Sequence, residues 1–227
     1  MPKRLPPSEQ AAEPDGNGCL TGFMLPPLAA LCVSLFLAFL LFGSGDANGL
    51  PAPLARIDAS LPPLSSVFTP EVQYWSDEIR AWSAAAGLDP NLAATVMQIE
   101  SCGDPQALSS AGAMGLFQVM PYHFAVDDFP YNPATNAQRG LDYLRRSFEA
   151  AGGDARLALA GYNGGIGVIA YAELTWPLQT QRYAYWGSGI YNEASSGAGE
   201  SARLQEWLQA AGVSLCAQAR DRLGISP

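Results

Sequence analysis

The helical spacing of apolar residues that begins at Glu71 is the feature that most constrains the fold of this chain. In the segment EVQYWSDEIRAWSAAAG, large apolar residues recur three or four positions apart and Gly87 suits a helix end. The apolar positions are Val72, Trp75, Ile79 and Trp82. No run of alternating polar and apolar residues is long enough for a convincing strand. The sequence therefore predicts a mainly α fold with short loops.

Further segments carry local signals for helix ends. In DPNLAATVMQIES, Asp89 can cap a helix whose first residue is Pro90, which is the favoured order. NAQRGLDYLRRSFEAAGG places leucines and a phenylalanine on one face, and Gly152 and Gly153 end it. Asp154 can cap a new helix in DARLALAGYNGG, and SARLQEWLQAAG indicates a last short helix.

The first seventy residues differ in character from the helical part. Residues 1–18 are polar and rich in Pro, Gly and acids, which predicts a disordered cytoplasmic tail. Leu20–Phe42 contains no charged residue, so residues 19–43 are expected to form an uncleaved transmembrane signal-anchor helix. Because two prolines interrupt the run, a cleaved signal peptide stays the alternative. Residues 44–70 are rich in Pro, Gly and Ser and indicate a linker.

The composition argues against several classes of ligand and catalytic site. The formal net charge of -9 argues against binding nucleic acid, which needs a basic surface. His123 is the only histidine, so a zinc site of His and Cys ligands is improbable, and a Ser-His-Asp triad would depend on that one imidazole. We therefore expect no metal and no cofactor, and chemistry that rests on carboxylates.

Glu100 is the candidate acid. Leu92, Val96 and Glu100 are spaced at i, i+4 and i+8, so they share one helical stripe. One reading is an acid at a helix end that turns to water. Negative charge near a helix C-terminus is disfavoured by the dipole, which argues against that interpretation. The alternative is a partly desolvated carboxyl with a raised pKa. A carboxylic acid still protonated near neutral pH is what a glycosidase uses to protonate its leaving oxygen.

Two later segments are candidates for the walls of a cleft. In SSAGAMGLFQVMPYHF, the amide of Gln118 stands among apolar residues, either satisfied by backbone in a tight turn or facing sugar hydroxyls and acetamido groups. In ALAGYNGGIG, Tyr162 and Asn163 sit where a helix of small residues becomes a Gly-rich turn. Taken alone, each segment is compatible with an ordinary turn.

Together, in this order and spacing, the three segments resemble a known family. Glu100-Ser101 resembles the Glu-Ser that ends the active-site helix of the SLT-type lytic transglycosylases, which are related to goose-type lysozyme. The stretch AGAMGLFQVMP after Ser109 is similar to their Gly-Leu-Met-Gln-Leu-Met-Pro, and AGYNGG to their Ala-Tyr-Asn-Ala-Gly. The resemblance implies a lysozyme-like helical domain over residues 71–195. It does not cover the helical extension expected over residues 196–227.

The resemblance also implies roles for single residues. Glu100 would be the single catalytic acid and base. QTQRYAYW resembles the family's Glu-Thr-x-x-Tyr, so the hydroxyl of Tyr183 would reach the carboxylate. The residues expected to contact or line the substrate site are Ser101, Ser109, Gln118, Met120, Tyr162, Asn163 and Tyr183. Phe117, Gly161 and Gln179 depart from the family pattern, and Gln179 removes a charge that many members have near the acid.

The function implied is cleavage of the β-1,4 bond between N-acetylmuramic acid and N-acetylglucosamine in peptidoglycan, with formation of a 1,6-anhydro ring. A hydrolytic lysozyme on the same fold, a non-catalytic cell-wall-binding module and a membrane adaptor stay open as alternatives. The expected partners are peptidoglycan strands and the membrane. The expected location is a single-pass membrane protein with its catalytic domain outside the cytoplasm, or a secreted protein if the signal is cleaved.

The four cysteines divide into two pairs. Cys19 and Cys32 belong to the predicted membrane region, whereas Cys102 and Cys216 would lie outside the cytoplasm, where disulfides persist. A Cys102–Cys216 bridge would fix the C-terminal helix beside the active-site helix and add roughly 4 to 5 kcal/mol of stability on a chain-entropy argument. Two free buried thiols are the alternative.

Overall fold

The computed structural model describes residues 63–226. Within this range the chain forms helices joined by turns, and the only β pairing consists of two isolated bridges, Leu108 with Met114 and Met114 with Val119. The prediction of a mainly α fold is therefore confirmed for this part of the chain.

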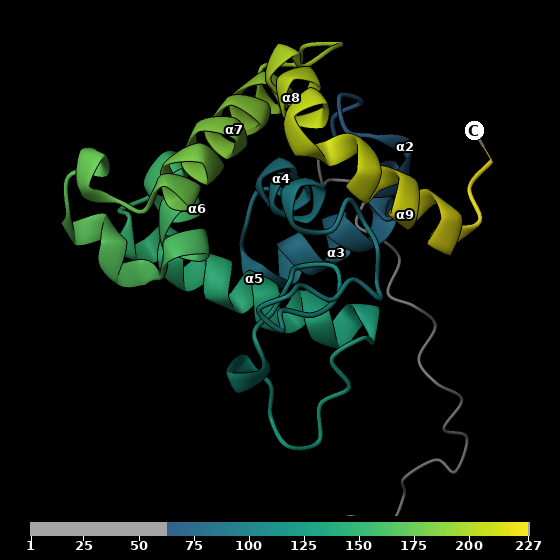
Figure 1. The fold of residues 1–227 in the computed structure, drawn as a ribbon, viewed down its shortest axis with the longest axis horizontal. Coiled ribbons are helices and arrows are strands. Elements are labelled where there is room, and N and C mark those ends of the chain that lie inside the picture. Colours follow the sequence, from purple (N-terminus) through teal and green to yellow (C-terminus); the bar gives the residue numbers. More distant parts are fainter. Residues whose placement is uncertain (1–62, 227) are drawn as a thin grey trace, which may run out of the picture. The chain divides into compact units, whose positions relative to one another are not determined.

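Within residues 63–226, eight α-helices carry the fold (Figure 1). They are α2 (Pro70–Gln73), α3 (Ser76–Ala86), α4 (Pro90–Glu100), α5 (Pro133–Ala150), α6 (Ala155–Gly164), α7 (Leu178–Ser195), α8 (Ala202–Trp207) and α9 (Val213–Leu223). Three 3₁₀ turns, η1 (Pro121–His123), η2 (Ile166–Ala170) and η3 (Glu173–Thr175), lie in the connections, and a π-helical turn, η4 (Leu208–Gly212), joins α8 to α9. In Figure 1, α4 lies at the centre, with α3 and α5 on one side and α7 to α9 on the other.

The predicted helix ends are confirmed. Gly87 follows α3 in the left-handed conformation, with φ at 67°. The side chain of Asp89 accepts a hydrogen bond from the backbone of Asn91 at 2.8 Å, and Pro90 is the first residue of α4. Asp154 accepts from the backbone of Leu157 and caps α6 in the same way. These caps need only neighbours in sequence, which is why the sequence shows them.

Two helical expectations need correction. The apolar pattern from Glu71 predicts one helix, but the chain breaks it into α2 and α3 at Trp75. The cause is tertiary: the buried indole of Trp75 donates to the carbonyl of Gly103 at 2.9 Å, and the Glu71 carboxylate is fully buried against Arg220. The last helix is also longer than predicted, since it continues beyond residue 212 as α9.

The long helix α7 has no clear signal in the sequence, because Gly187 and Gly189 interrupt its apolar pattern. Both glycines serve close packing. A Cβ at Gly187 would lie 3.0 Å from Leu159, and a Cβ at Gly189 would lie 2.6 Å from Arg203. The two glycines therefore lower the helix propensity of α7 but allow Leu159 and Arg203 to pack closely against it.

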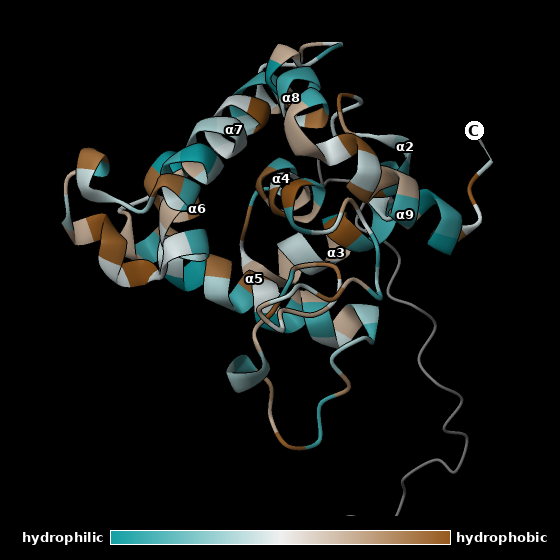
Figure 2. Cartoon of the chain, viewed as in Figure 1, coloured by the Kyte–Doolittle hydropathy of each residue, from teal (hydrophilic) through white to brown (hydrophobic). Residues whose placement is uncertain are grey.

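The core surrounds α4, whose residues Leu92 to Gln98 are all buried. Figure 2 shows much of α4 in the colour of apolar residues, whereas the outer end of α9 is hydrophilic. A disulfide joins Cys102, just after α4, to Cys216 on α9. The prediction of a bridge instead of two free thiols is confirmed.

The end of the predicted linker is part of the packed structure. Val67 and Phe68 are buried, and the backbone of Ser65 donates to the side chain of Asn91 at 3.0 Å. The predicted tail, membrane helix and first part of the linker, residues 1–62, lie outside the described residues. Within residues 63–226, no helix is both long and apolar enough to cross a membrane.

Candidate active site

Glu100 is the last residue of α4 and lies where the buried stripe of that helix reaches a cleft. Val96 and Leu92, one and two turns earlier, are buried in the core, whereas Glu100 is half-buried. The carboxyl lines a cleft of about 560 Å³. The stripe therefore leads from the core to the cleft wall, so the acid at its end has apolar surroundings on one side and the cleft on the other.

Those surroundings change the acidity of Glu100. Burial raises the pKa of its carboxyl from 4.5 to about 7, while the hydroxyl of Tyr183 opposes this by favouring the charged form. Tyr183 is buried, and its hydroxyl lies close enough to the carboxyl of Glu100 to influence the pKa of that carboxyl. A carboxyl with this pKa can both donate and accept a proton near neutral pH.

Gln118 lies in the cleft wall with its backbone in the left-handed region, at φ 47°. Its Nε2 donates to the carbonyls of Ala107 at 3.2 Å and Gly115 at 3.0 Å. Both neighbours are acceptors, so the amide nitrogen must face them and Oε1 must face away. Because no described residue donates to Oε1, Gln118 offers the cleft an acceptor. Its nitrogen is thus satisfied by backbone, whereas its oxygen is available to a substrate.

Ser109 and Met120 also line the cleft, at the two ends of the same loop. The hydroxyl of Ser109 accepts from the backbone of Ala113 at 2.9 Å, which holds the tight turn between them. Both residues therefore lie where the resemblance expects them.

Ser101 does not line the cleft, which corrects the expectation that it contacts the substrate. It is fully buried, and its hydroxyl donates to the carbonyl of Leu116 at 2.7 Å and accepts from the backbone of Gly103 at 3.1 Å. The residue after Glu100 points away from the cleft because α4 ends there. Ser101 instead fixes the cleft loop to the end of the helix.

Tyr162 and Asn163 come from the last turn of α6 and face the cleft. The hydroxyl of Tyr162 donates to the carbonyl of Phe117 at 2.7 Å. Burial first, and then the nearby Glu100 charge, raises the pKa of Tyr162 well above its ordinary value, so it stays a neutral donor. The Oδ1 of Asn163 accepts from Thr180 at 3.1 Å, which leaves Nδ2 without a described partner and available as a donor.

Asn136 and Thr180 support the site, although the sequence motifs did not predict a role for either residue. Asn136 is fully buried on α5, accepts from the backbone of Phe117 at 2.8 Å, and donates to the carbonyls of Met114 and Pro130 at 2.7 and 2.9 Å. The sequence signal for Asn136 resembles that for Glu100, because each is a polar residue on the apolar stripe of a helix. Thr180 carries no such signal.

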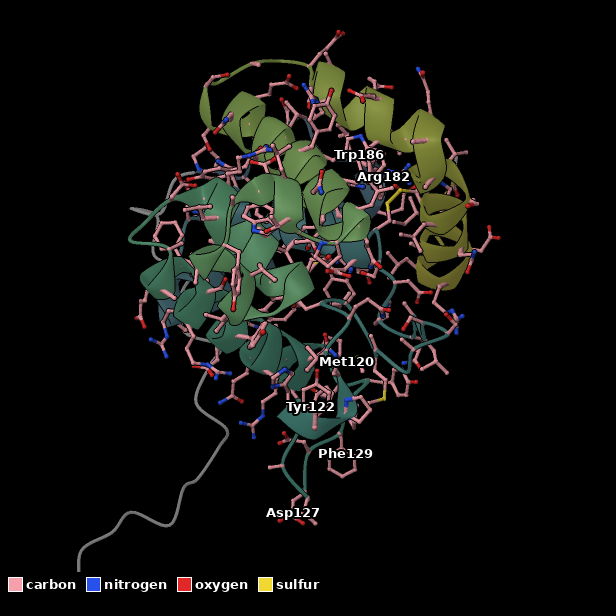
Figure 3. The ribbon with its side chains drawn as sticks, turned by 60° about the vertical axis from the view of Figure 1, so that its left-hand side comes forward. Met120, Tyr122, Asp127, Phe129, Arg182 and Trp186 are labelled. Atoms are coloured by element: carbon pink, nitrogen blue, oxygen red, sulfur yellow. A yellow bond between two sulfur atoms is a disulfide. The ribbon has the colours of Figure 1, made fainter. Side chains whose placement is uncertain are left out.

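Within the described residues, Glu100 is the only carboxylate that lines the cleft. Asp104 is buried and accepts from the backbone of Gln106, and Asp128 pairs with Arg139 at 2.6 Å. Asp127 lies out on the loop below Tyr122 in Figure 3. A second flanking acid of the kind that two-carboxylate glycosidases use is thus not found among the described acids.

His123 and Trp176 lie in the connections between helices, one in the cleft and the other away from it. His123 lines the cleft, and its pKa is lowered by burial and by the neighbouring charge of Arg146. Trp176 is buried away from the cleft, where its indole donates to the carbonyls of Val168 and Tyr171.

The described residues contain one cluster of possible metal ligands, and its two sulfurs and one carboxylate oxygen are already engaged. It consists of Glu71, Cys102 and Cys216. The two sulfurs form the disulfide, and Glu71 pairs with Arg220 at 2.6 Å. The cluster lies outside the cleft.

A second hollow of about 810 Å³ meets the first at Glu100, Asn163 and Gln179, which line both. The two hollows therefore form one groove that passes the carboxyl. In Figure 3, Met120 and Tyr122 mark the first half, and Arg182 and Trp186 mark the second half at some distance from them.

Comparison with known proteins found a similar domain and several similar proteins. Residues 77–175 match the profile of the transglycosylase SLT domain. The transglycosylase of Enterobacteria phage PRD1 is 38% identical over 112 residues, which are 48% of this chain and 40% of that protein. The membrane-bound lytic murein transglycosylase C of Mannheimia succiniciproducens is 35% identical over 79 residues, or 29% of this chain and 22% of that protein. The chain thus spans well under half the length of these relatives.

Among solved structures, the lytic transglycosylase Slt of Pseudomonas aeruginosa is similar over 53% of this chain and 24% of its own, with a TM-score of 0.44 and 20% identity. The sequence match includes the helix that ends in Glu100, the cleft loop and the Tyr162-Asn163 turn. The match therefore relates residues 77–175 of this chain to the SLT-type transglycosylase domains.

Proposed function

We propose that the chain is a lytic transglycosylase that cleaves the β-1,4 bond between N-acetylmuramic acid and N-acetylglucosamine in peptidoglycan. The observation that carries the proposal is a single carboxyl in the groove with a pKa of about 7, flanked by neutral donors and acceptors. The resemblance of the domain to transglycosylases supports the same reading.

The proposed reaction needs one acid because the substrate supplies the other groups. Protonated Glu100 gives its proton to the glycosidic oxygen, the bond from that oxygen to C1 breaks, and the 2-acetamido group of the muramoyl sugar stabilises the positive charge at C1. The Glu100 carboxylate then takes the proton of the muramoyl 6-hydroxyl, whose oxygen bonds to C1. The acid is thereby restored, and a 1,6-anhydro ring forms.

The neighbours of Glu100 suit this sequence. The free Oε1 of Gln118 can accept from an acetamido N–H or a hydroxyl, and the free Nδ2 of Asn163 can donate to a sugar oxygen. The hydroxyl of Tyr183, close to the carboxylate, stabilises the charged form that acts as base in the second step. No step requires a metal or a cofactor.

The test uses the full chain and its Glu100→Gln variant on purified peptidoglycan, with soluble products identified by mass. We expect 1,6-anhydro ends from the parent and a loss of rate of about 10³-fold in the variant, because the amide of Gln has no acidic proton to transfer. Reducing ends from the parent alone would assign the same acid to a hydrolytic lysozyme. Equal binding without release by either protein would favour a cell-wall-binding module.

We further infer that residues 19–43 anchor the protein in a membrane, with the domain of residues 71–195 and the extension of residues 196–227 outside the cytoplasm. The uncharged run Leu20–Phe42 supports an anchor, and the Cys102–Cys216 disulfide suits a compartment where such bonds persist. Release of the chain from membranes by alkaline carbonate would contradict the anchor.

A further inference from the structure

Arg182 differs from every other arginine in residues 63–226. That range contains nine arginines, and the other eight each form an ion pair with an aspartate or glutamate. Arg182 is exposed on α7, has no ion pair or hydrogen bond with a described residue, and lines the second half of the groove. In a chain with a net charge of -9, an arginine that no acid neutralises marks a place suited to an anion.

A second, independent observation points to the same half of the groove. The Nε1 of Trp186, one helical turn after Arg182, is buried and has no hydrogen-bond partner among the described residues. Buried N–H groups are nearly always paired in folded proteins. This half of the groove therefore combines a free cation with an unpaired donor, and its only acid is Glu100 at the junction.

The C-terminal extension forms the outer wall of this half. Trp207, Ala210 and Ala211 line it, and the last two belong to the π-helical turn η4. That turn is shaped by close packing: a Cβ at Gly212 would lie 2.3 Å from the Trp207 ring. Cys216 follows within α9 and is bonded to Cys102, two residues after Glu100. The wall is thus covalently fixed to the end of the helix that carries the acid.

We propose that this second half of the groove, the Arg182 half, binds the peptide branch of the glycan strand through a peptide carboxylate. The proposal rests on the proposed function, which places a glycan strand along the groove past Glu100. The sugar hydroxyls and acetamido groups of that strand are neutral, so the free carboxylates of the peptide branch are the anions that Arg182 meets. Trp186 and Trp207 border the space that the branch occupies.

The experiment compares two substrates that differ only in charge. One is peptidoglycan with free peptide carboxylates, and the other is the same material with those carboxylates amidated. For the full chain we expect kcat/KM to be on the order of tenfold higher on the free form, mainly through KM, as a charge-assisted hydrogen bond implies. Arg182→Gln brings this ratio close to one, and Arg182→Lys retains part of it, because lysine keeps the charge but loses the planar fork.

The matched control is Arg145→Gln, which removes the same charge from α5 outside the groove and should keep the parent's ratio. Thermal unfolding of each variant checks that folding is intact, which is expected since Arg182 is exposed. A parent without preference, or an Arg182→Gln variant that keeps the preference, would overturn the proposal.

A binding measurement separates this proposal from the proposed function. Tryptophan fluorescence of Glu100→Gln is titrated with peptide-bearing muropeptides in free and amidated form. If the parent does not cleave peptidoglycan, the proposed function fails. Weaker binding of the amidated form, abolished by adding Arg182→Gln, would still support the peptide site, and equal binding of both forms would refute it.

Discussion

At the scale of the residue, the site depends on where a few polar atoms are left without protein partners. Glu100 faces the groove with its carboxyl partly desolvated, Gln118 keeps Oε1 free because its Nε2 is taken by two carbonyls, and Asn163 keeps Nδ2 free because Thr180 holds its oxygen. In Gln118 and Asn163, the hydrogen bonds made by one atom of the side-chain amide orient the other atom toward the groove. Beside Arg182 and Trp186, the groove therefore presents a titrating acid, an acceptor and a donor in defined places.

The raised pKa of Glu100 predicts a pH-dependent effect of Glu100→Gln on stability. The folded state holds the proton up to about pH 7 and the unfolded state only to about 4.5, so ionisation in the folded protein is unfavourable. Folding stability contributed by the neutral acid is complete below pH 4.5 and is lost as pH rises to 7. Because Gln cannot ionise, the variant should be more stable than the parent at pH 8, by up to about 3 kcal/mol, and nearly equal at pH 4.

Urea unfolding of parent and variant at the two pH values measures this effect. Gln118→Glu is a useful contrast, because it introduces a carboxylate into the same cleft instead of removing one. A Glu100→Gln variant that is equally stable or less stable than the parent at both pH values would show that the carboxyl is well solvated.

At the scale of the element, the cleft loop owes its shape to α5. The buried side chain of Asn136 makes three hydrogen bonds to the loop and its neighbour segment, at Phe117, Met114 and Pro130. Gly140, one turn further along α5, has no side chain, and a Cβ there would lie 2.5 Å from Phe117. An amide and a missing side chain on one helix thus set the position of a loop that has little regular structure of its own.

Asn136→Ala should lower the free energy of unfolding by roughly 2 to 4 kcal/mol, because it leaves buried backbone groups without partners. Activity should fall at temperatures where the variant is still folded, since Gln118 moves with the loop. The control is Asn132→Ala at the exposed N-cap of the same helix, where the loss is expected to be about 1 kcal/mol. Similar losses for both variants would mean that Asn136 does not hold the loop.

At the scale of the whole described part of the chain, the disulfide connects the two walls of the groove. Cys102 and Cys216 are 114 residues apart in sequence, and their bond joins the end of α4 to the helix that follows η4. Beside it, the fully buried Glu71 pairs with Arg220 and links α2 to α9. The second half of the groove therefore depends on contacts between the beginning and the end of the described chain.

Replacing both Cys102 and Cys216 by serine should lower the free energy of unfolding by roughly 4 kcal/mol, because so long a loop loses its constraint in the unfolded state. Denaturant unfolding measures this value, and limited proteolysis should release α9 first. Cys19→Ser with Cys32→Ser is the matched control and should unfold like the parent. An unchanged midpoint for the Cys102 and Cys216 pair would show that noncovalent contacts alone hold the extension.

The sequence by itself determined the features that depend on neighbours along the chain. The caps at Asp89 and Asp154, the left-handed end at Gly87 and the acid at the end of an apolar stripe all follow from contacts within one or two helical turns. The order of three short motifs was enough to predict the similarity to the transglycosylase SLT domain that residues 77–175 show. Such signals are readable because the interacting groups are also neighbours in the printed sequence.

Only the tertiary structure decided which polar atoms face the groove and how far the groove extends. Ser101 is directly beside Glu100 yet lies in the core, because the chain turns at the helix end. The helix α7 contains two glycines whose role is visible only in the folded protein, where Leu159 and Arg203 pack closely against them. The outer wall comes from residues more than a hundred positions after Glu100, and contacts over such separations depend on the folded path of the chain.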